Sequence, residues 1–447
     1  MAKQDGLEWL SGTFGLEPRW TREPNIAKVE LLARKHLKIL QDSFCHVTFY
    51  AQGAFNKLFK VETAAGCSLM RVTLPVDPSK KTNSEVATIN FVHQNTDMPV
   101  PRIFAFDDSS DNELGFEWIL MEMLPGVTLR RKWRNLSDES KRGLVKQVAK
   151  YHSQLFCHKF SAIGNIFVSP RDLPSPKESS QSTVATDTEK IPQESKQTLP
   201  VLGQLVSMIF FWGDHINQDV SRGPFTNSED WISARLSLIL NDQEIIMKTS
   251  DDEDDIEEAQ DAKEIAEKLL KLLPSIFPPD ANASEQSVLF HDDLSMQNIL
   301  VDDDGKITGI IDWECVSALP LWRVCGFPEF LEGRNRNEEP KKDQYAPADE
   351  EDSGDPREEA LDNEGINSLY WEHLLEYELS LLRDLFLKEM EDIAPQWIEE
   401  LEKGQIKADF EAAVQNCDNS WRTRQIKLWL DAQERGENWS LRKRFLE

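Results

Sequence analysis

The sequence predicts an α+β protein in which a small antiparallel β-sheet precedes a larger, mainly helical part. Short β-branched or aromatic runs, separated by glycine and small polar residues, fill residues 44–74. Apolar residues recur at helical spacing further on, at Leu374, Tyr377, Leu381, Leu382 and Leu385. Alternation is typical of strands, and a repeat of three to four residues is typical of helices.

The first predicted elements follow one another without an internal repeat. Residues 24–40 favour a helix that starts after Pro24, so residues 1–40 are assigned to a helical extension. "FCHVTFYAQG", "KLFKVET" and "SLMRVTL" predict a meander of three strands. "NSEVATINFVHQ" predicts a helix capped by Asn83 or Ser84, and "EWILMEMLPG" a buried strand. Residues 41–124 are therefore predicted to form the sheet-bearing unit.

The remaining residues, 125–447, are predicted to form the helical unit with two flexible insertions. A capping box of Thr226 and Glu229 in "TNSEDW" opens one of its helices. Residues 169–199 are rich in Ser, Thr and Pro and are expected to be a flexible insertion, as are residues near 334–363. The acidic tract "SDDEDDIEEAQD" is expected to be a solvated loop or the start of a helix.

Composition and charge disfavour several classes of function. The 447 residues include 79 acidic and 50 basic side chains, a formal net charge of -29, which opposes binding to nucleic acid or anionic membranes. No segment has the apolar length of a membrane span, and the start resembles neither a signal peptide nor a presequence. The six scattered cysteines fit a reducing compartment. We expect a cytoplasmic protein that binds neither nucleic acid nor membrane; the sequence leaves its oligomeric state open.

The stretch "HDDLSMQNILVDDDGKITGIIDWE", residues 291–314, places a dense set of polar side chains around two apolar runs. A calcium-binding loop is excluded by spacing, because a turn at Gly305 would put ligand positions on Leu300 and Ile311. A β-hairpin accounts for the apolar runs and for the turn at Asp304 and Gly305. It leaves the polar residues at the open end of the hairpin unexplained.

Those polar residues are His291, Asp293, Asn298 and Asp312. Because a hairpin brings its two ends together, Asn298 and Asp312 should be neighbours, with Asp293 close by. Phosphoryl transfer uses such groups: one carboxylate accepts the proton of a hydroxyl, while a carboxamide and a second carboxylate hold magnesium. Magnesium takes oxygen ligands and keeps some of its waters, so two protein oxygens and the phosphates of a nucleotide suffice.

"HDDLSMQN" and "IIDWE" resemble the catalytic loop H-x-D-L-x-x-x-N and the metal-binding Asp of the kinase-like phosphotransferases. The ending DWE, in place of DFG, and the lack of an A-P-E segment are more similar to aminoglycoside phosphotransferases and choline kinases than to protein kinases. The sequence of residues 71–92, "RVTLPVDPSKKTNSEVATINFV", resembles the expanded fungal members of this group. The resemblance implies a bilobal protein-kinase-like fold that binds ATP with Mg2+ between its lobes.

The same resemblance implies a role for each polar residue of the stretch. Asp293 would be the catalytic base, and His291 would organise the catalytic loop through hydrogen bonds. Asn298 and Asp312 would bind Mg2+. His152, in "VAKYHSQLF", is expected to be a packed structural histidine rather than a catalyst.

The resemblance also implies an ATP site upstream. Gly53 and Asn56, in "YAQGAFNKLFKV", would belong to a hairpin over the phosphates that carries a single glycine. Arg71, where most relatives have lysine, would reach the α- and β-phosphates and pair with Glu85.

The strand "FEWILMEMLPG" resembles the linker that binds adenine in this group. By the match, Glu122 would lend its carbonyl and Leu124 its amide, while Met121 would border the pocket. A buried edge strand remains compatible with the same residues, because the adenine contacts use backbone groups.

We therefore expect an ATP- and magnesium-dependent phosphotransferase that acts on a hydroxyl of an unidentified small molecule. The acidic composition is compatible with a cationic acceptor, and Glu372, Glu376 or Glu378 could meet an amine, although a solvated helix face explains them as well. The alternative is a kinase-like pseudoenzyme or scaffold, motivated by Arg71 and the single glycine. A protein kinase is disfavoured because an A-P-E segment is missing.

Overall fold

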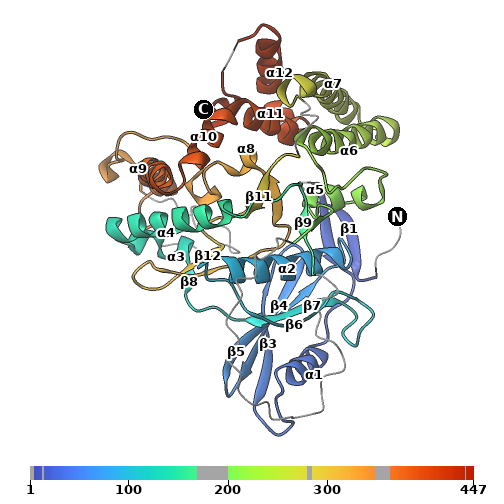
Figure 1. Cartoon of the computed structure of the whole chain (residues 1–447), viewed down its shortest axis with the longest axis vertical. Helices are drawn as coiled ribbons and strands as arrows, with labels where there is room; N and C mark the ends of the chain where they lie inside the picture. The colour runs from blue at the N-terminus through green and yellow to red at the C-terminus, as the bar shows by residue number, and fades with distance from the viewer. Residues whose placement is uncertain are drawn as a thin grey trace, which may run out of the picture.

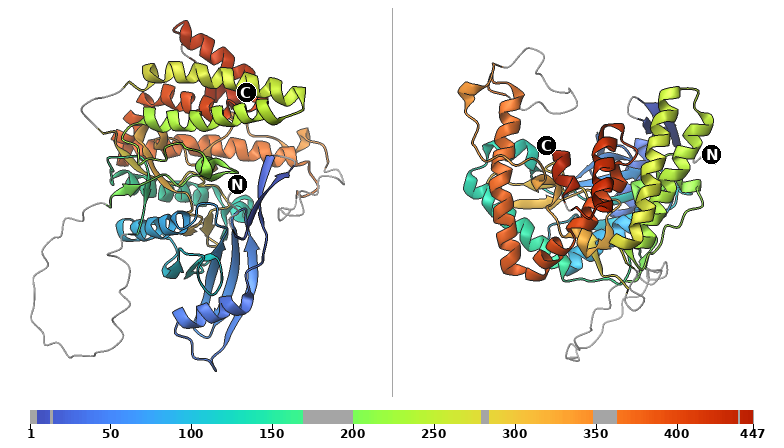
Figure 2. Two further views of the ribbon diagram at one scale, coloured as in Figure 1. Left: turned by 90° about the vertical axis from the view of Figure 1, so that its right-hand side faces the viewer. Right: turned by 90° about the horizontal axis from the view of Figure 1, so that it is seen from above.

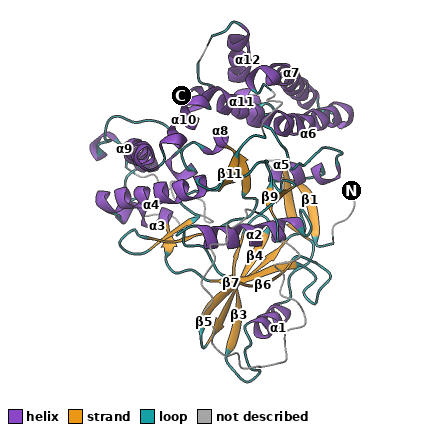
Figure 3. Cartoon of the chain, in the orientation of Figure 1, coloured by secondary structure: helices purple, strands orange, loops and turns teal. Residues whose placement is uncertain are grey.

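The computed structural model describes residues 5–12, 15–168, 200–278, 284–347, 363–437 and 439–446. A five-stranded antiparallel sheet forms one lobe, and a mainly helical lobe lies beyond it (Figure 1). Figure 3 shows the long strands at one end and most of the helices at the other, with shorter strands between them. The predicted α+β, two-lobed architecture is confirmed.

The sheet lobe contains the predicted meander and two further strands. The meander consists of β3 (Cys45–Gln52), β4 (Asn56–Thr63) and β5 (Gly66–Thr73). β7 (Glu117–Glu122) pairs with β5, and β6 (Ile103–Asp107) covers the free edge of β7. The strand order is therefore β3-β4-β5-β7-β6.

Two helices flank this sheet. α1 (Ile26–His36) begins at Asn25, whose side chain accepts hydrogen bonds from the first backbone amides, and it packs Val29 and Leu32 onto the core of the sheet. α2 (Lys80–Asn95) lies across the boundary between the lobes (Figure 1).

The predicted cap of α2 was wrong, because the helix begins three residues before Asn83. Asn83 binds the Asp108 carboxylate at 2.8 Å, and Ser84 accepts a hydrogen bond from Asn165 at 2.9 Å. Both side chains therefore serve tertiary contacts inside the helix. A short polar residue near the start of a helix signals a cap only when its side chain turns back to the backbone.

The prediction of a purely helical extension was wrong for its first part. A hairpin of β1 (Leu7–Gly12) and β2 (Gly15–Trp20) precedes α1, with Leu7 paired to Trp20. Gly6, just before β1, and Gly15, at the start of β2, have φ values of 99° and 107°, which an α-helix does not contain. The left view of Figure 2 shows this hairpin reaching the helical lobe, where Trp9 contacts Trp212 at 5.0 Å between ring centroids.

The helical lobe surrounds one large core. Its longer helices are α4 (Asp138–Phe156), α6 (Ser228–Thr249), α7 (Glu253–Ile276), α9 (Ser368–Ile393), α10 (Pro395–Lys403), α11 (Gln405–Asn416) and α12 (Ser420–Glu434). Short helices are α3 (Leu129–Lys132), α5 (Met208–Phe211), α8 (Leu321–Val324) and α13 (Leu441–Leu446). Within the described ranges, no helix is long and apolar enough to cross a membrane.

Several smaller predictions have an outcome in this lobe. The cap of α6 is Asn227, which accepts from the Asp230 amide at 2.8 Å, so the capping box built on Thr226 was one residue off. The acidic tract forms the start of α7, which is one of the two structures predicted for it. The insertion at 169–199 lies outside the described residues, as do residues 348–362 of the second one.

Short strands hold the polar stretch in place. β12 (Ile299–Val301) and β13 (Ile307–Ile310) form the predicted hairpin, and β8 (Val127–Thr128) extends it. β11 (Ser287–Phe290) precedes the stretch and pairs with β14 (Ser317–Pro320), which follows it. Residues 291–316 are therefore a loop closed at its base by two paired strands. β9 (Asn165–Ile166) and β10 (Leu202–Gly203) form a separate pair nearby.

One titratable contact ties a short 3-10 helix, η2 (His215–Asn217), to α6. His215 Nδ1 lies 2.5 Å from the Ile209 carbonyl oxygen, and Nε2 lies 2.5 Å from the Asp242 carboxylate. Both partners only accept, so both ring nitrogens must carry protons. Burial lowers the pKa of His215, but the Asp242 carboxylate and the Ile209 carbonyl outweigh it and raise the pKa above its usual value.

We predict that this contact makes the free energy of unfolding depend on pH. A raised pKa in the folded state stabilises the protein below the unfolded pKa of about 6.5, and the gain is lost as pH rises through the folded value. His215→Gln should cost about 1 kcal/mol at pH 6 and clearly less at pH 9. Urea titrations at the two pH values measure this, with the exposed His46→Gln as control. An equal cost at both values would contradict the prediction.

Candidate active site

The polar residues of the 291–314 stretch converge at the boundary between the lobes. Asn298 Nδ2 donates to the Asp293 backbone oxygen at 2.8 Å and to the Asp293 carboxylate at 2.9 Å. The Ile311 amide donates to the Asn298 carbonyl at 3.0 Å, which places Asn298 beside the segment that carries Asp312. The geometry expected of the hairpin is present.

These residues offer oxygens suited to a hard cation. The Asn298 amide hydrogens are directed at Asp293, which leaves the Asn298 Oδ1 to act as a ligand. Asp312 has a φ of 65°, a conformation that Asp tolerates better than most residues. Among the described residues, no group of three or more His, Cys, Asp or Glu can hold a metal. Because magnesium keeps several of its waters, two protein oxygens would suffice beside phosphates and water.

His291 holds the loop together rather than facing the open site. Its Nε2 lies 3.0 Å from the Ile311 carbonyl, and its ring meets Trp313 edge to face at 4.8 Å. Burial lowers the pKa of His291, and the Ile311 carbonyl and nearby carboxylates offset this only in part. The neutral imidazole thus donates from Nε2 and fixes the backbone that leads into Asp312.

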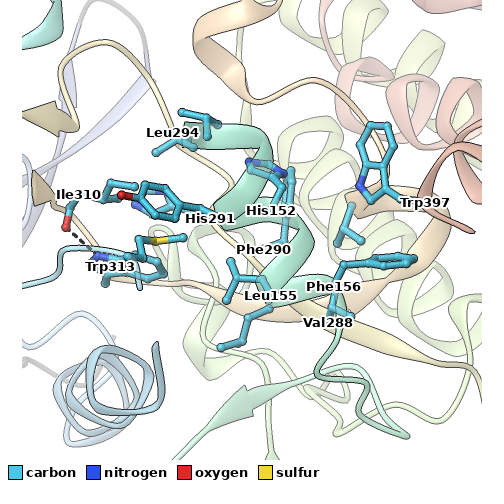
Figure 4. A pocket seen from close by; sticks show the side chains of 15 residues that line it. His152, Leu155, Phe156, Val288, Phe290, His291, Leu294, Ile310, Trp313 and Trp397 are labelled. Carbon is cyan, nitrogen blue, oxygen red and sulfur yellow. Dashed lines mark hydrogen bonds between the residues drawn. The ribbon is translucent and has the colours of Figure 1, made fainter. Parts of the chain in front are cut away.

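A small cavity lies behind this loop, lined mainly by apolar side chains (Figure 4). His291 and His152 both line it, and His152 packs edge-on against Phe386 at 5.7 Å. Burial, and secondarily His291, lowers the pKa of His152 to about 4. His152 is therefore a neutral packed side chain, as expected, and a cavity of this character does not suit a triphosphate.

The opposite side of the loop carries a buried cluster of charges. Arg71 Nη1 lies 2.5 Å from Glu85, and Nη2 lies 2.5 Å from Glu314 and 3.4 Å from Asp312. Arg71 is 5% exposed and Glu85 is 1% exposed. Burial lowers the pKa of Arg71, but the three carboxylates outweigh burial and raise it, so the guanidinium stays charged. The Arg71–Glu85 contact expected from the sequence is present.

Two members of this cluster were missed by sequence reasoning, Lys81 and Glu314. Lys81 forms an ion pair with Glu314, which also accepts a hydrogen bond from Asn56 at 2.8 Å. Burial raises the pKa of Glu314, but Lys81 and then Arg71 outweigh it and lower the pKa to about 2. The sequence could have indicated Lys81, because Lys81 and Glu85 are four residues apart and therefore lie on the same face of the predicted helix.

The hairpin between β3 and β4 is anchored to both lobes. The Gly53 amide donates to the Asn56 carbonyl at 2.9 Å, and a Cβ added at Gly53 would find open space. The Asn56 side chain also accepts a hydrogen bond from Thr73 at 2.9 Å. Phe55 packs against Phe211 and Trp212 of the helical lobe at 5.5 and 5.9 Å between centroids. The tip of the hairpin is thus fixed, while the space above Gly53 is free.

The strand expected to border adenine is β7. Met121 is buried beside Val86 of α2. The Glu122 amide donates to the Arg102 carbonyl at 2.9 Å. Beyond the strand, Leu124 lies over β13, where a Cβ added at Gly309 would approach Leu124 Cδ1 to 2.8 Å.

An additional carboxyl group contacts Asp293. Glu329, in the 3-10 helix η3 (Glu329–Leu331), lies close enough to Asp293 for the two carboxyl groups to interact. Burial and then Asp293 raise the pKa of Glu329 to about 7. The Phe330 amide donates to the Leu294 carbonyl at 3.0 Å, which holds η3 against the loop that carries Asp293. No motif in the sequence indicated Glu329, because its place beside Asp293 depends on how the chain folds back.

Two of the three acidic residues suggested for an amine have partners within the protein. Glu376 binds Arg336 at 3.1 Å. Glu378 binds Lys141 at 2.7 Å and accepts from the Trp133 indole at 2.7 Å. These contacts occupy the carboxylates of Glu376 and Glu378, and the acidic side chains beside Asp293 lie elsewhere, on η3.

The sequence pattern of the phosphotransferase enzyme family matches residues 46–322. A subtelomeric hrmA-associated cluster protein of Aspergillus fumigatus is 24% identical over 337 residues, 65% of this chain and 62% of that protein. The altered inheritance of mitochondria protein 9, mitochondrial, of Eremothecium gossypii is 23% identical over 305 residues, 61% of this chain and 48% of that protein. The match therefore covers less than two thirds of the length of either relative.

Solved structures with a similar chain include aminoglycoside phosphotransferase APH(4)-Ia. Its TM-score is 0.43 at 13% identity, covering 91% of this chain and 99% of that one. The GDP and kanamycin complex of APH(2")-IIia has a TM-score of 0.42 at 13% identity, covering 93% of this chain and 100% of that one.

The buried charge cluster leads to a stability prediction. Arg71→Met should lower the free energy of unfolding by about 3–5 kcal/mol, because it leaves buried carboxylates without their cation. Arg102→Met is the matched control, since the Arg102–Glu122 pair is 61% and 30% exposed; it should cost under about 1 kcal/mol. Urea unfolding of both variants tests this, and similar small losses in the two would contradict it.

Proposed function

Because the chain belongs to the phosphotransferase enzyme family, we propose that it transfers the γ-phosphate of ATP, bound with Mg2+, to a hydroxyl of a small molecule. The observation that carries the proposal is the convergence of Asp293 and Asn298 with the segment of Asp312, beneath Arg71 of the other lobe. A base, two oxygen ligands and a buried cation are the groups that this chemistry requires.

In this proposal Asp293 is the base and acts on the acceptor hydroxyl. The hydroxyl oxygen forms a bond to the γ-phosphorus, the bond from that phosphorus to the β,γ-bridging oxygen breaks, and the hydroxyl proton moves to Asp293. Asn298 supports the role, because its amide holds the Asp293 carboxylate at 2.9 Å. His291 acts at a distance by fixing the Ile311 carbonyl.

Asn298 and Asp312 would hold Mg2+, which supplies charge neutralisation for the phosphates. Arg71, oriented by Glu85, faces the α- and β-phosphates. The open space above Gly53 lets the hairpin backbone approach a phosphate, and Asn56 fixes the second strand of that hairpin.

The remaining nucleotide contacts belong to β7 and its continuation. Glu122 would offer its carbonyl and Leu124 its amide to adenine, with Met121 beside the ring. In this assignment residues 41–124 form the nucleotide lobe and residues 125–447 the catalytic and acceptor lobe.

The acceptor side is acidic. Glu329 lies beside Asp293, while the neighbouring Asp292 is held by Arg323 at 2.5 Å. An amine on the acceptor would fit beside Glu329, so we assign a cationic alcohol as the preferred class. The opposite possibility, a nucleotide-free scaffold, is favoured by one observation: Arg71 already has three carboxylate partners.

The cytoplasmic location stays a prediction from the sequence. The alternative compartment is the mitochondrion, because the name of one relative places that relative there. Fractionation of cells that express the tagged chain decides between them. Recovery with the mitochondrial fraction would overturn the cytoplasmic assignment.

We predict that Asp293→Asn lowers turnover by about 1,000-fold because the base is lost, while MgATP binding stays within about twofold. ATP consumption measured across a library of small alcohols and amino alcohols gives the turnover, and calorimetry gives the MgATP affinity. Asp303→Asn is the control, because Asp303 is an exposed turn residue that pairs with Lys132 on the surface. Full turnover by the Asp293 variant would exclude Asp293 as the base.

Asp312→Ala should weaken binding of MgATP by at least about tenfold, because a ligand of the cation is removed. Metal-free ATP should bind the variant and the wild type with similar affinity. Calorimetry with and without magnesium separates the two effects. If magnesium strengthens ATP binding equally in both proteins, the ligand role of Asp312 is wrong.

A further inference from the structure

Lys81 is a lysine whose charge lies inside the boundary between the lobes. Its side chain is 1% exposed, and the ammonium pairs with Glu314. The same nitrogen lies 3.4 Å from Asn56 Oδ1 and 5.8 Å from the centre of the Phe55 ring. A buried ammonium persists only with compensating partners, so its position is tightly determined.

The partner of Lys81 is central to the cluster. Glu314 Oε2 receives Lys81, the Arg71 guanidinium at 2.5 Å and the Asn56 amide at 2.8 Å. Glu314 is also two residues from Asp312, in the same turn of chain. One carboxylate therefore ties together the hairpin strand β4, the strand β5, the helix α2 and the proposed metal loop.

The balance of charge depends on Lys81. Two cations, Arg71 and Lys81, face three carboxylates, Glu85, Asp312 and Glu314. Without Lys81, Arg71 alone would have to serve all three. The carboxylates would then hold the Arg71 guanidinium more closely. The surplus negative charge of the cluster would also oppose the approach of phosphates.

We propose that Lys81 is a positioning residue of the nucleotide site, which acts by holding Glu314 so that Arg71 and Asp312 keep the places needed for MgATP. The proposal rests on the function proposed above.

A purely structural role makes a different prediction. A lysine needed only for stability would lower the stability of the fold when removed and leave the affinity for MgATP unchanged. The chain offers a matched control in Lys141, whose side chain is 6% exposed and pairs with Glu378 at 2.7 Å in the helical lobe. Lys141→Met removes a comparable buried lysine of the helical lobe that does not belong to the charge cluster.

The test compares the MgATP dissociation constants of the full-length wild type, Lys81→Met and Lys141→Met by calorimetry, with melting temperatures measured in parallel. We expect Lys81→Met to weaken MgATP binding at least about tenfold, a difference of 1.4 kcal/mol. Lys141→Met should bind as the wild type does, although both variants melt earlier.

A double-mutant cycle with Glu314→Gln tests whether Lys81 acts through Glu314. In Lys81→Met with Glu314→Gln the charge balance is restored, so the double variant should bind MgATP no more weakly than Lys81→Met alone. Strictly additive losses would overturn the proposal, because they would mean that the two side chains act independently.

Lys81→Arg provides a second test in case Lys81→Met fails to fold. It keeps the charge and the ion pair, so it should melt near the wild type and still bind MgATP severalfold more weakly, since its wider head displaces Glu314. Wild-type affinity in folded Lys81→Met or Lys81→Arg would overturn this inference alone. A wild type that does not bind MgATP at millimolar concentration would overturn the proposed function and this inference with it.

Discussion

A buried ion cluster joins the two lobes, beside the apolar contacts between them. Arg71 and Lys81 from the sheet lobe meet Asp312 and Glu314 from the helical lobe, and Glu85 completes the set. Each charge was removed from water at a cost that only the others offset, so removing one leaves the rest uncompensated. A cluster of this kind contributes little net stability, but it admits few alternative geometries. The position of β5 and α2 relative to the metal loop is thereby set before any ligand arrives.

The second constraint is the closure of the loop at residues 291–316. β11 and β14 pair at its base, the β12–β13 hairpin forms its middle, and His291 bonds to the Ile311 carbonyl across it. A polar loop with exposed carboxylates would otherwise be mobile, because it has few apolar contacts of its own. Here the apolar strands on either side of the loop pack into the core. Because they hold the loop in place, Asp293 and Asp312 stay at a fixed separation. The acidic residues can thus be exposed and still be placed accurately.

The sequence predicted what depends on local pattern and missed what depends on the fold. The hairpin followed from two apolar runs and a turn, so the proximity of Asn298 to the Asp312 segment could be inferred. The Arg71–Glu85 contact followed from the family resemblance. Glu329 reaches Asp293 only because η3 packs under the catalytic loop, and no spacing in the chain encodes that. The β1–β2 hairpin was misjudged because its apolar partners, Phe55 and Phe211, are remote in sequence.

The pair of Asp293 and Glu329 shows how the acceptor could take part in its own activation. A neighbouring carboxylate disfavours the ionisation of a carboxyl group, so burial and then Asp293 raise the pKa of Glu329 to about 7. Glu329 therefore largely keeps its proton in mildly acidic solution. A cationic group bound beside Glu329 would favour its ionised form and expel that proton. Asp293 would then be free to receive the proton of the hydroxyl, so that a charged acceptor prepares the base that its own reaction needs.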